Sequence, residues 1–257
     1  VFLSAPLGVQ PYLTPKLLDQ IDPDLTLGLA LTYDIFKYKF ENVKSFINTK
    51  RFVLIYPESS KYQPKQNIHQ IQTSTSVITV PKQILNCGAD LVVAYNQTFS
   101  QFKDNITRKD VQEELNQFDQ FQAINVTKEF QISMLSNSKI IFTNNPQFAQ
   151  NNSIINVQSN YALFKQLLGG SKQNISFVVD FQTTLANDDI CLSSNLIHVR
   201  NSKYKQSIQT IGQCKHECCK MNLGYLNHLI ICGELLGKIY ITMHNVGWIL
   251  QEIENSK

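Results

Sequence analysis

Short apolar runs alternate with helical patterns in the middle of the chain. Three runs rich in branched and aromatic side chains each predict a buried strand: Leu91–Tyr95, Phe121–Val126 and Lys139–Thr143. Helical patterns separate these runs, at 96–102, 109–118 and 128–135, and Thr127 can cap the last of them. Short strands joined by helices are typical of a parallel sheet with right-handed crossovers. The sequence therefore predicts an α/β fold with a parallel βαβαβ core over about residues 90–143.

Flanking strands are predicted on both sides of this core. On the amino-terminal side they are Leu25–Tyr33 and Phe52–Tyr56, with a helical pattern at 36–46 between them. On the carboxyl-terminal side, alternation around 175–181 predicts a half-buried strand, and Leu196–Val199 is expected to return beside it. The remaining predictions are a polar loop at 58–75, a short helix at 81–86, and a hairpin or a short strand and helix at 153–168.

The longest helical pattern lies near the carboxyl terminus. Apolar side chains spaced by three and four positions run from Tyr204 to Cys232 and predict one long helix, although Gly212 and Gly224 interrupt it. The pattern at 235–253 does not resolve the structure of the tail, for which a strand followed by a helix is one option. The predicted domains are an irregular segment at 1–24 with one short helix at 16–21, an α/β domain at 25–200, and a C-terminal helix and tail at 201–257.

Composition and charge narrow the function classes. The chain has 257 residues, 17% of them charged, and a formal net charge of +3, so the dense basic face of a duplex-binding domain is not expected. Its six cysteines are spread too thinly for a secreted disulfide framework, which favours a reducing compartment and a cytoplasmic location. No apolar run approaches the roughly 20 residues of a membrane span.

The C-terminal cysteines and histidines offer one candidate metal site. Cys214, Cys218, His228 and Cys232 follow a Cys-x3-Cys and His-x3-Cys spacing that can supply four zinc ligands. A single straight helix cannot bring ligands 14 to 18 residues apart around one ion, so zinc requires the helix to break, as at Gly224. The favoured interpretation is that the cysteines pack in a core and that the protein holds no cofactor.

Other polar residues give no sign of a catalytic centre. Asp188-Asp189 is typical of a solvated turn, and His69, His198 and His244 are isolated in the sequence. The chain has no Gly-x-Ser-x-Gly elbow, phosphate loop or Gly-x-Gly-x-x-Gly motif. An enzyme subunit is an alternative only if its site assembles from distant residues, with a deep polar pocket that contains His198 or Asp188.

The segment 33–40 interleaves aromatic rings with lysines. Binders of single-stranded nucleic acid use such residues as stacking faces and phosphate contacts, and the candidates here are Tyr33, Phe36, Lys37, Tyr38 and Lys39. A single-stranded nucleic-acid-binding module with the C-terminal zinc site is therefore another alternative. The favoured interpretation is an amphipathic element, with aromatic rings toward the core and lysines toward water.

The order of elements resembles the apical domain of group II chaperonins over about residues 25–225. The resemblance rests on the segments Gly28–Asp34, Phe46–Tyr56, Gly88–Tyr95, Ala123–Lys128, Met134–Thr143 and Phe177–Phe181, followed by the predicted helix at 204–222. The most similar forms are the degenerate chaperonin-like domains of phosphatidylinositol-3-phosphate 5-kinases and of chaperonin-like assembly factors. That family's Gly-Asp-Gly-Thr and Gly-Gly-Gly nucleotide motifs are absent, so no ATPase activity is implied.

The resemblance implies a protein-binding surface. In that family the helix corresponding to 128–135 lines the client groove, and the matching positions here are Lys128, Gln131, Ile132 and Leu135. We therefore expect a non-enzymatic scaffold module that buries apolar helix and loop surface against other protein subunits of a larger assembly.

Overall fold

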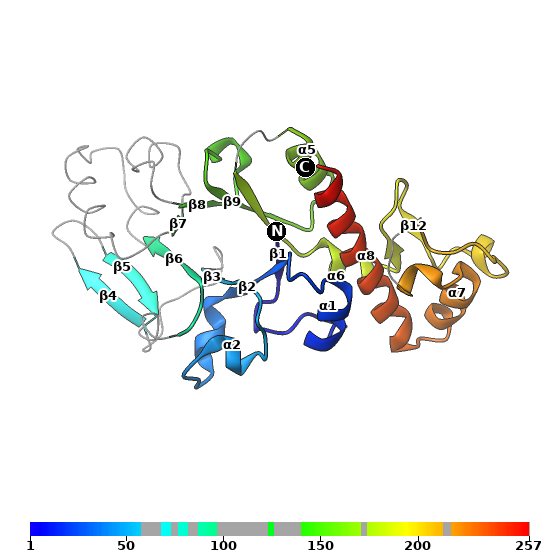
Figure 1. The fold of residues 1–257 in the computed structure, drawn as a ribbon, viewed down its shortest axis with the longest axis horizontal. Coiled ribbons are helices and arrows are strands. Elements are labelled where there is room, and N and C mark those ends of the chain that lie inside the picture. Colours follow the sequence, from blue (N-terminus) through cyan, green and yellow to red (C-terminus); the bar gives the residue numbers. More distant parts are fainter. Residues whose placement is uncertain are drawn as a thin grey trace. The chain divides into compact units, whose positions relative to one another are not determined.

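The structure is a computed structural model with two compact units. It describes residues 1–57, 68–72, 77–81, 87–96, 123–125, 140–170, 174–212 and 217–256 (Figure 1). The first unit comprises Val1–Gly8, Gly28–Val157 and Ser171–Val178. The second comprises Val9–Leu27, Gln158–Gly170 and Val179–Lys257. Each unit therefore combines segments that are far apart in the sequence.

The first unit is built on one large sheet. Within the described residues the sheet has ten strands, in the order β3-β2-β1-β10-β9-β8-β7-β6-β5-β4, and β3 also pairs with β6. The strands of the ring are β1 (Phe2–Ser4), β2 (Gly28–Thr32), β3 (Val53–Tyr56), β6 (Leu91–Asn96), β7 (Ala123–Asn125), β8 (Ile140–Thr143), β9 (Ser153–Gln158) and β10 (Ile175–Val179). The hairpin of β4 (Ile68–Gln72) and β5 (Val77–Pro81) extends antiparallel from β6.

Eight of the ten strands, all except β4 and β5, form a ring that is closed by the pairing of β3 with β6. Their order around the ring follows their order in the sequence, and the pairings from β1 through β9 are parallel. A closed parallel ring in sequence order is the arrangement of a (β/α)8-type barrel, in which functional sites gather at the carboxyl ends of the strands. A functional site is therefore expected at the carboxyl ends of these strands.

The predicted α/β class and its parallel core are confirmed. The strands β6, β7 and β8 pair in parallel within the predicted 90–143 core. The helices predicted between them lie outside the described residues. So do residues 82–86 of the short helix predicted at 81–86, whose first residue belongs to β5, and most of the predicted loop at 58–75, within which β4 was not anticipated. A chaperonin-apical-like architecture is not supported, because the sheet continues past this core and closes on itself.

Apolar side chains from seven strands of the ring form the core of the first unit. Its buried members are Ala30, Leu54, Tyr56, Leu91, Val93, Ala123, Phe142, Ile154 and Val178. The strands β2 and β3 are buried at every position, which explains why the sequence shows continuous apolar runs there. Between these two strands lie the 3-10 helix η1 (Tyr33–Lys37) and the short helix α2 (Val43–Phe46). A further 3-10 helix, η3 (Pro146–Phe148), follows β8.

The second unit is mostly helical. Its elements are α1 (Pro15–Ile21), α5 (Tyr161–Gly170), α6 (Phe181–Asn187), β11 (Ile190–Cys191), β12 (Ile197–His198), η4 (Ser202–Tyr204), η5 (Glu217–Lys220), α7 (Leu223–Ile231) and α8 (Leu235–Asn255). One of its cores joins α6, α7 and α8 through Ala186, Cys191, Val199, Ile211, Leu223, Leu226, Ile230 and Ile241. No helix in the described part of the chain is long and apolar enough to cross a membrane.

The prediction of one long helix from Tyr204 to Cys232 is wrong. The described part of this segment contains η4, η5 and the separate helix α7, which starts where the Asn222 side chain accepts a hydrogen bond from the Tyr225 amide. A Cβ atom at Gly224 would lie 2.7 Å from the Ser207 carbonyl oxygen, so this glycine permits a close chain approach that a straight helix would not make.

The rest of the C-terminal region also differs from what the sequence patterns suggested. The tail, which those patterns left unresolved, forms the long helix α8, a continuous helix of 21 residues. The strand predicted at Leu196–Val199 shrinks to β12, and β12 pairs antiparallel with β11 and not with β10. Its predicted partner, β10, instead lies in the ring between β1 and β9.

Candidate functional site

The clearest acidic candidate lies directly after a strand of the ring. Asp180 follows β10, and its backbone amide donates to the carbonyl of Gln158, the last residue of β9, at 3.2 Å. Since this bond joins the residues at the ends of both strands, β9 and β10 end at the same edge of the sheet. Asp180 therefore occupies the position at which barrel proteins carry their functional residues.

The Asp180 carboxylate accepts a hydrogen bond from the Ser159 side chain through one of its two oxygens. The Ser159 hydroxyl donates to Asp180 Oδ1 at 2.8 Å and lies 3.3 Å from the Thr184 hydroxyl. Thr184 in turn donates to the Asp180 carbonyl at 3.3 Å. Although Asp180 is the N-cap residue of α6, its side chain makes no capping bond. The hydroxyl of Ser159 therefore bonds Oδ1 and not Oδ2.

Burial raises the pKa of Asp180 above its usual value of 3.8, and the hydrogen bond from Ser159 works in the opposite direction. A carboxyl with a perturbed pKa at the end of a barrel strand is a candidate for acid–base or nucleophilic chemistry. Asp180 was not among the candidate residues predicted from the sequence. The available signal was an aspartate placed immediately after the apolar run Phe177-Val178-Val179.

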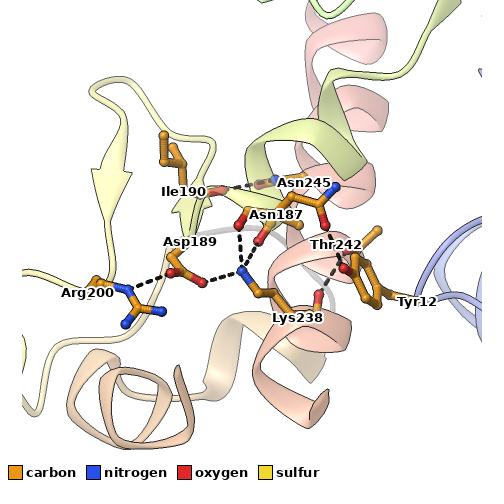
Figure 2. A network of polar contacts seen from close by, with 9 residues as sticks. Tyr12, Asn187, Asp189, Ile190, Arg200, Lys238, Thr242 and Asn245 are labelled. Carbon is orange, nitrogen blue, oxygen red and sulfur yellow. Dashed lines mark hydrogen bonds and ion pairs between the residues drawn. The ribbon is translucent and has the colours of Figure 1, made fainter. Parts of the chain in front are cut away.

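A buried ion pair fixes the far end of α6. Asp189 is 5% exposed, and its carboxylate contacts Lys238 Nζ and, at 2.8 Å, Arg200 Nε (Figure 2). The Lys238 ammonium also donates to the carbonyls of Ala186 at 2.9 Å and Asn187 at 2.7 Å, at the C-terminus of α6. Asp188 is exposed, so the predicted solvated turn describes Asp188 and not Asp189. The positive charge of the Lys238 ammonium suits the C-terminus of α6, which is the negative end of the helix dipole.

Asn245 of α8 holds the two segments that flank this turn. Its side chain accepts from the Leu192 amide at 2.7 Å and donates to the carbonyls of Gln182 and Ile190, both at 3.1 Å. Figure 2 shows Asn245 and Lys238 reaching from α8 toward the α6–β11 connection. Helix α6, and with it Asp180 at its start, is therefore fixed by α8 through buried polar contacts.

A second polar pair lies nearby in the sequence of α8. His244 is fully buried, and its Nδ1 atom lies 3.1 Å from Cys219 Sγ. Its other ring nitrogen, Nε2, donates to the Leu192 carbonyl at 2.6 Å, so that Nδ1 is the acceptor nitrogen of the neutral ring. Cys219 is disulfide-bonded. His244, which is isolated in the sequence, thus lies beside the sulfur atom of Cys219 in the fold.

The four residues of the predicted zinc set are not seen together. His228 and Cys232 are both exposed on α7 and its C-cap, with the Cys232 Sγ atom 3.7 Å from either ring nitrogen. The side chains of Cys214 and Cys218 lie outside the described residues. Within the described residues, no group of three or more His, Cys, Asp or Glu side chains could hold a metal ion.

The other predicted sites have different outcomes. Tyr33 and Phe36 are buried in the first unit, whereas Lys37, Tyr38 and Lys39 are exposed. Lys128, Gln131, Ile132 and Leu135, predicted to bind protein, lie outside the described residues, as does the side chain of His69. His198 is exposed on β12.

The fold and site define an α/β protein with a closed parallel ring and a carboxylate at the edge where its strands end. Residues 176–257 match the model of the queuine tRNA-ribosyltransferase family. This match runs from β10 to the end of the chain and includes Asp180, Asp189, Cys219 and His244.

Curated relatives agree with the family match. A stretch of 75 residues is 35% identical to the queuine tRNA-ribosyltransferase of Oceanobacillus iheyensis and covers 28% of this chain and 20% of that protein. Stretches of 63 and 62 residues are 33% and 36% identical to the enzymes of Baumannia cicadellinicola and Prochlorococcus marinus, each over 23% of this chain and 17% of the relative. The matched segments thus span no more than a fifth of those proteins' length.

These comparisons correct two predictions. The resemblance to chaperonin apical domains is wrong, because the carboxyl-terminal third of the chain is similar to a family of transferases. The prediction of a non-enzymatic scaffold is wrong for the same reason, and the alternative of an enzyme whose site assembles from distant residues fits better. The residues proposed in that alternative, His198 and Asp188, are both exposed, and Asp180 is the better candidate.

Proposed function

We propose that this chain forms part of a transferase that exchanges a base in tRNA, with queuine as the incoming base. The match of residues 176–257 to the queuine tRNA-ribosyltransferase family carries the proposal. The position of Asp180 at the strand ends supports it independently. We place the reaction in the cytoplasm, in line with the thin spread of cysteines. Transfer of labelled queuine into tRNA is the direct test.

Asp180 supplies the chemistry in this proposal. As the bond between ribose C1′ and the outgoing base breaks, its electron pair goes to that base, which takes up a proton, and an Asp180 oxygen bonds to C1′. A nitrogen of the incoming base then attacks C1′ and loses its proton, and the electron pair of the ester bond returns to Asp180. Glycosidases use a carboxylate in the same two-step manner. Oδ1 stays with Ser159, so Oδ2 is the attacking oxygen.

The pH dependence of the reaction follows from the raised pKa of Asp180. Only the ionised carboxylate can attack C1′, so activity is lost as the pH falls through the pKa of Asp180. Since burial raises that pKa, the acid limb of the kcat/KM profile should lie above pH 3.8. The Ser159→Ala substitution removes a bond that lowers the pKa, and it should move the limb to still higher pH. A matched control is Ser207→Ala, because the Ser207 hydroxyl accepts a hydrogen bond from the nearby Gln209 amide at 3.3 Å and the substitution leaves the backbone bonds of Ser207 in place. An acid limb that shifts to lower pH in Ser159→Ala would contradict the assignment of this limb to Asp180.

A structural zinc ion is a further part of the proposal. Once the disulfide at Cys219 is reduced, its thiolate and His244 Nδ1 lie close enough to share one ion. The bond from His244 Nε2 to the Leu192 carbonyl is the outer contact that orients a metal-binding histidine. Cys214 and Cys218 would complete the four ligands, so that His244 and Cys219 replace His228 and Cys232 of the predicted set. Such an ion would tie η5 to α8.

Zinc content distinguishes the two ligand sets. Reduced protein should carry about one zinc ion per chain, measured by inductively coupled plasma mass spectrometry. The His244→Ala and Cys219→Ser substitutions should each lower this content several-fold, and the exposed His228→Ala serves as the matched control. Retention of zinc in both variants, or its loss in His228→Ala, would contradict the revised set.

A further inference from the structure

We propose that an exposed aromatic cluster on the first unit binds a single-stranded segment of RNA. The cluster, called here the aromatic platform, consists of Tyr38, Phe40 and Phe46 together with Lys37 and Lys39. Only Lys37, Tyr38 and Lys39 of this set were among the sequence candidates. Phe46 joins them through the fold, because α2 brings it back against the chain that follows η1.

The rings of the platform are stacked on one another and remain open to solvent. The centroids of Tyr38 and Phe46 are 5.7 Å apart with an interplanar angle of 31°, and those of Phe40 and Phe46 are 5.3 Å apart at 26°. Phe36, only 7% exposed, stacks on Phe40 at 5.8 Å and anchors the series in the core. Tyr38 is nevertheless 43% exposed and Phe46 45% exposed. Two rings thus keep surface that a base can cover.

Short local contacts hold the platform in place. The Asn42 side chain caps α2 by accepting from the Ser45 amide at 3.0 Å. Val43 and Ile47, on either side of Phe46, are buried. At the other end, the Tyr38 amide donates to the Ile35 carbonyl at 3.1 Å and closes η1. Because both ends are fixed, little conformational entropy is lost when a ligand stacks on the rings.

The charge of this region favours a polyanion. Residues 33–50 contain four basic and two acidic side chains, and the next residue, Arg51, is buried and adds no charge to this surface. Lys39 is exposed beside Tyr38 in the sequence, and the Lys37 side chain is 66% exposed while it pairs with Asp34 at 2.7 Å. Stacked aromatic rings with adjacent lysines suit bases and phosphates together. A protein partner would use the rings but not require this charge.

The inference rests on the proposed function in that it takes RNA as the substrate class. It goes further by placing an RNA contact on the first unit, on residues outside 176–257 that take no part in the chemistry assigned to Asp180. The two are separable, because binding of an oligonucleotide requires no base exchange.

The test is the affinity for a single-stranded oligoribonucleotide of about eight nucleotides, measured by fluorescence anisotropy. The Tyr38→Ala and Phe46→Ala substitutions should each weaken binding by about 5- to 100-fold, while Tyr38→Trp should retain it. Lys39→Ala should lower the slope of log K against log salt by about 0.7. Tyr225→Ala is the matched control, because Tyr225 is 48% exposed on α7 in the other unit.

The outcomes separate the inference from the proposed function. Equal affinity of wild type, Tyr38→Ala and Phe46→Ala would overturn the platform, as would affinity without salt dependence, because contacts from lysines to phosphates require that dependence. Weakened binding in these variants supports the platform whether or not the protein exchanges queuine. Absence of exchange in a wild-type protein that binds the oligonucleotide through Tyr38 would contradict only the proposed function.

Discussion

Replacement of Asp180 by asparagine is expected to lower kcat/KM for base exchange by at least about 10³-fold, because the amide cannot form the ester bond to ribose. The substitution is nearly isosteric, and the amide can still accept the hydrogen bond that Ser159 donates at 2.8 Å. The fold should therefore persist. Single-turnover rates with tRNA and labelled queuine measure the effect, and binding of tRNA measured in parallel should change little.

The adjacent helix provides a matched control for this substitution. Asp188 is an exposed carboxylate at the C-cap of α6, eight positions from Asp180 and at the other end of the same helix. Asp188→Asn removes the same charge from the second unit and should leave kcat/KM within about twofold of wild type. A similar loss of kcat/KM in both variants would mean that the loss follows from the removal of a negative charge. Asp180 would then not be the group that bonds to ribose.

Replacement of Lys238 by methionine is expected to lower the free energy of unfolding by about 2 to 3 kcal/mol. The Lys238 side chain is 23% exposed, and it neutralises an Asp189 side chain that is 8% exposed. Without the ammonium, Asp189 keeps only Arg200, whose side chain is 61% exposed, and the carbonyls of Ala186 and Asn187 lose a donor. Denaturant unfolding followed by circular dichroism measures the change.

A double substitution separates the ion pair from simple packing. If the cost comes from an unpaired buried charge, then combining Lys238→Met with Asp189→Asn should cost less than the two single changes added together. Lys203→Met is the control, since the Lys203 ammonium lies 4.8 Å from the centroid of the Tyr204 ring and its loss should cost less than about 0.5 kcal/mol. Additive single and double effects would show that Asp189 and Lys238 are not energetically coupled.

Local patterns were sufficient to predict the α/β class. The runs at β3, β6 and β8 are short, apolar and bounded by Pro, Asn or Asp, and each forms a strand close to the predicted position. The helix α1 is equally local: Thr14 caps it, and Pro15 begins it. In each case a few neighbouring residues determine the element, so a sequence window contains the information.

Closure of the ring depends on pairings that no window contains. The strand β1 has three residues, yet it joins β2 to β10, which lies more than 170 positions further along the chain. The resemblance to a chaperonin failed for this reason, because alternating strands and helices are common to many parallel α/β folds. Only the partners of the first and last strands distinguish a closed ring from an open sheet.

The candidate site was hidden in the same way. Ser159 and Asp180 are 21 positions apart, Cys219 and His244 are 25 apart, and Asp189 and Lys238 are 49 apart. Each pair is unremarkable in the sequence because its members lie on different elements. The segment 204–232 misled further, since its apolar spacing suits a helix while Gly212 and Gly224 admit close approaches to His244 and Ser207 that break it.

The most direct test of the account is the transfer of isotope-labelled queuine into tRNA by the purified protein. Label should become covalently attached to tRNA with wild-type protein and remain unattached with Asp180→Asn. A wild-type protein that binds tRNA but attaches no label, or an Asp180→Asn variant that attaches it at the wild-type rate, would contradict the assignment of this chain as a ribosyltransferase that acts through Asp180.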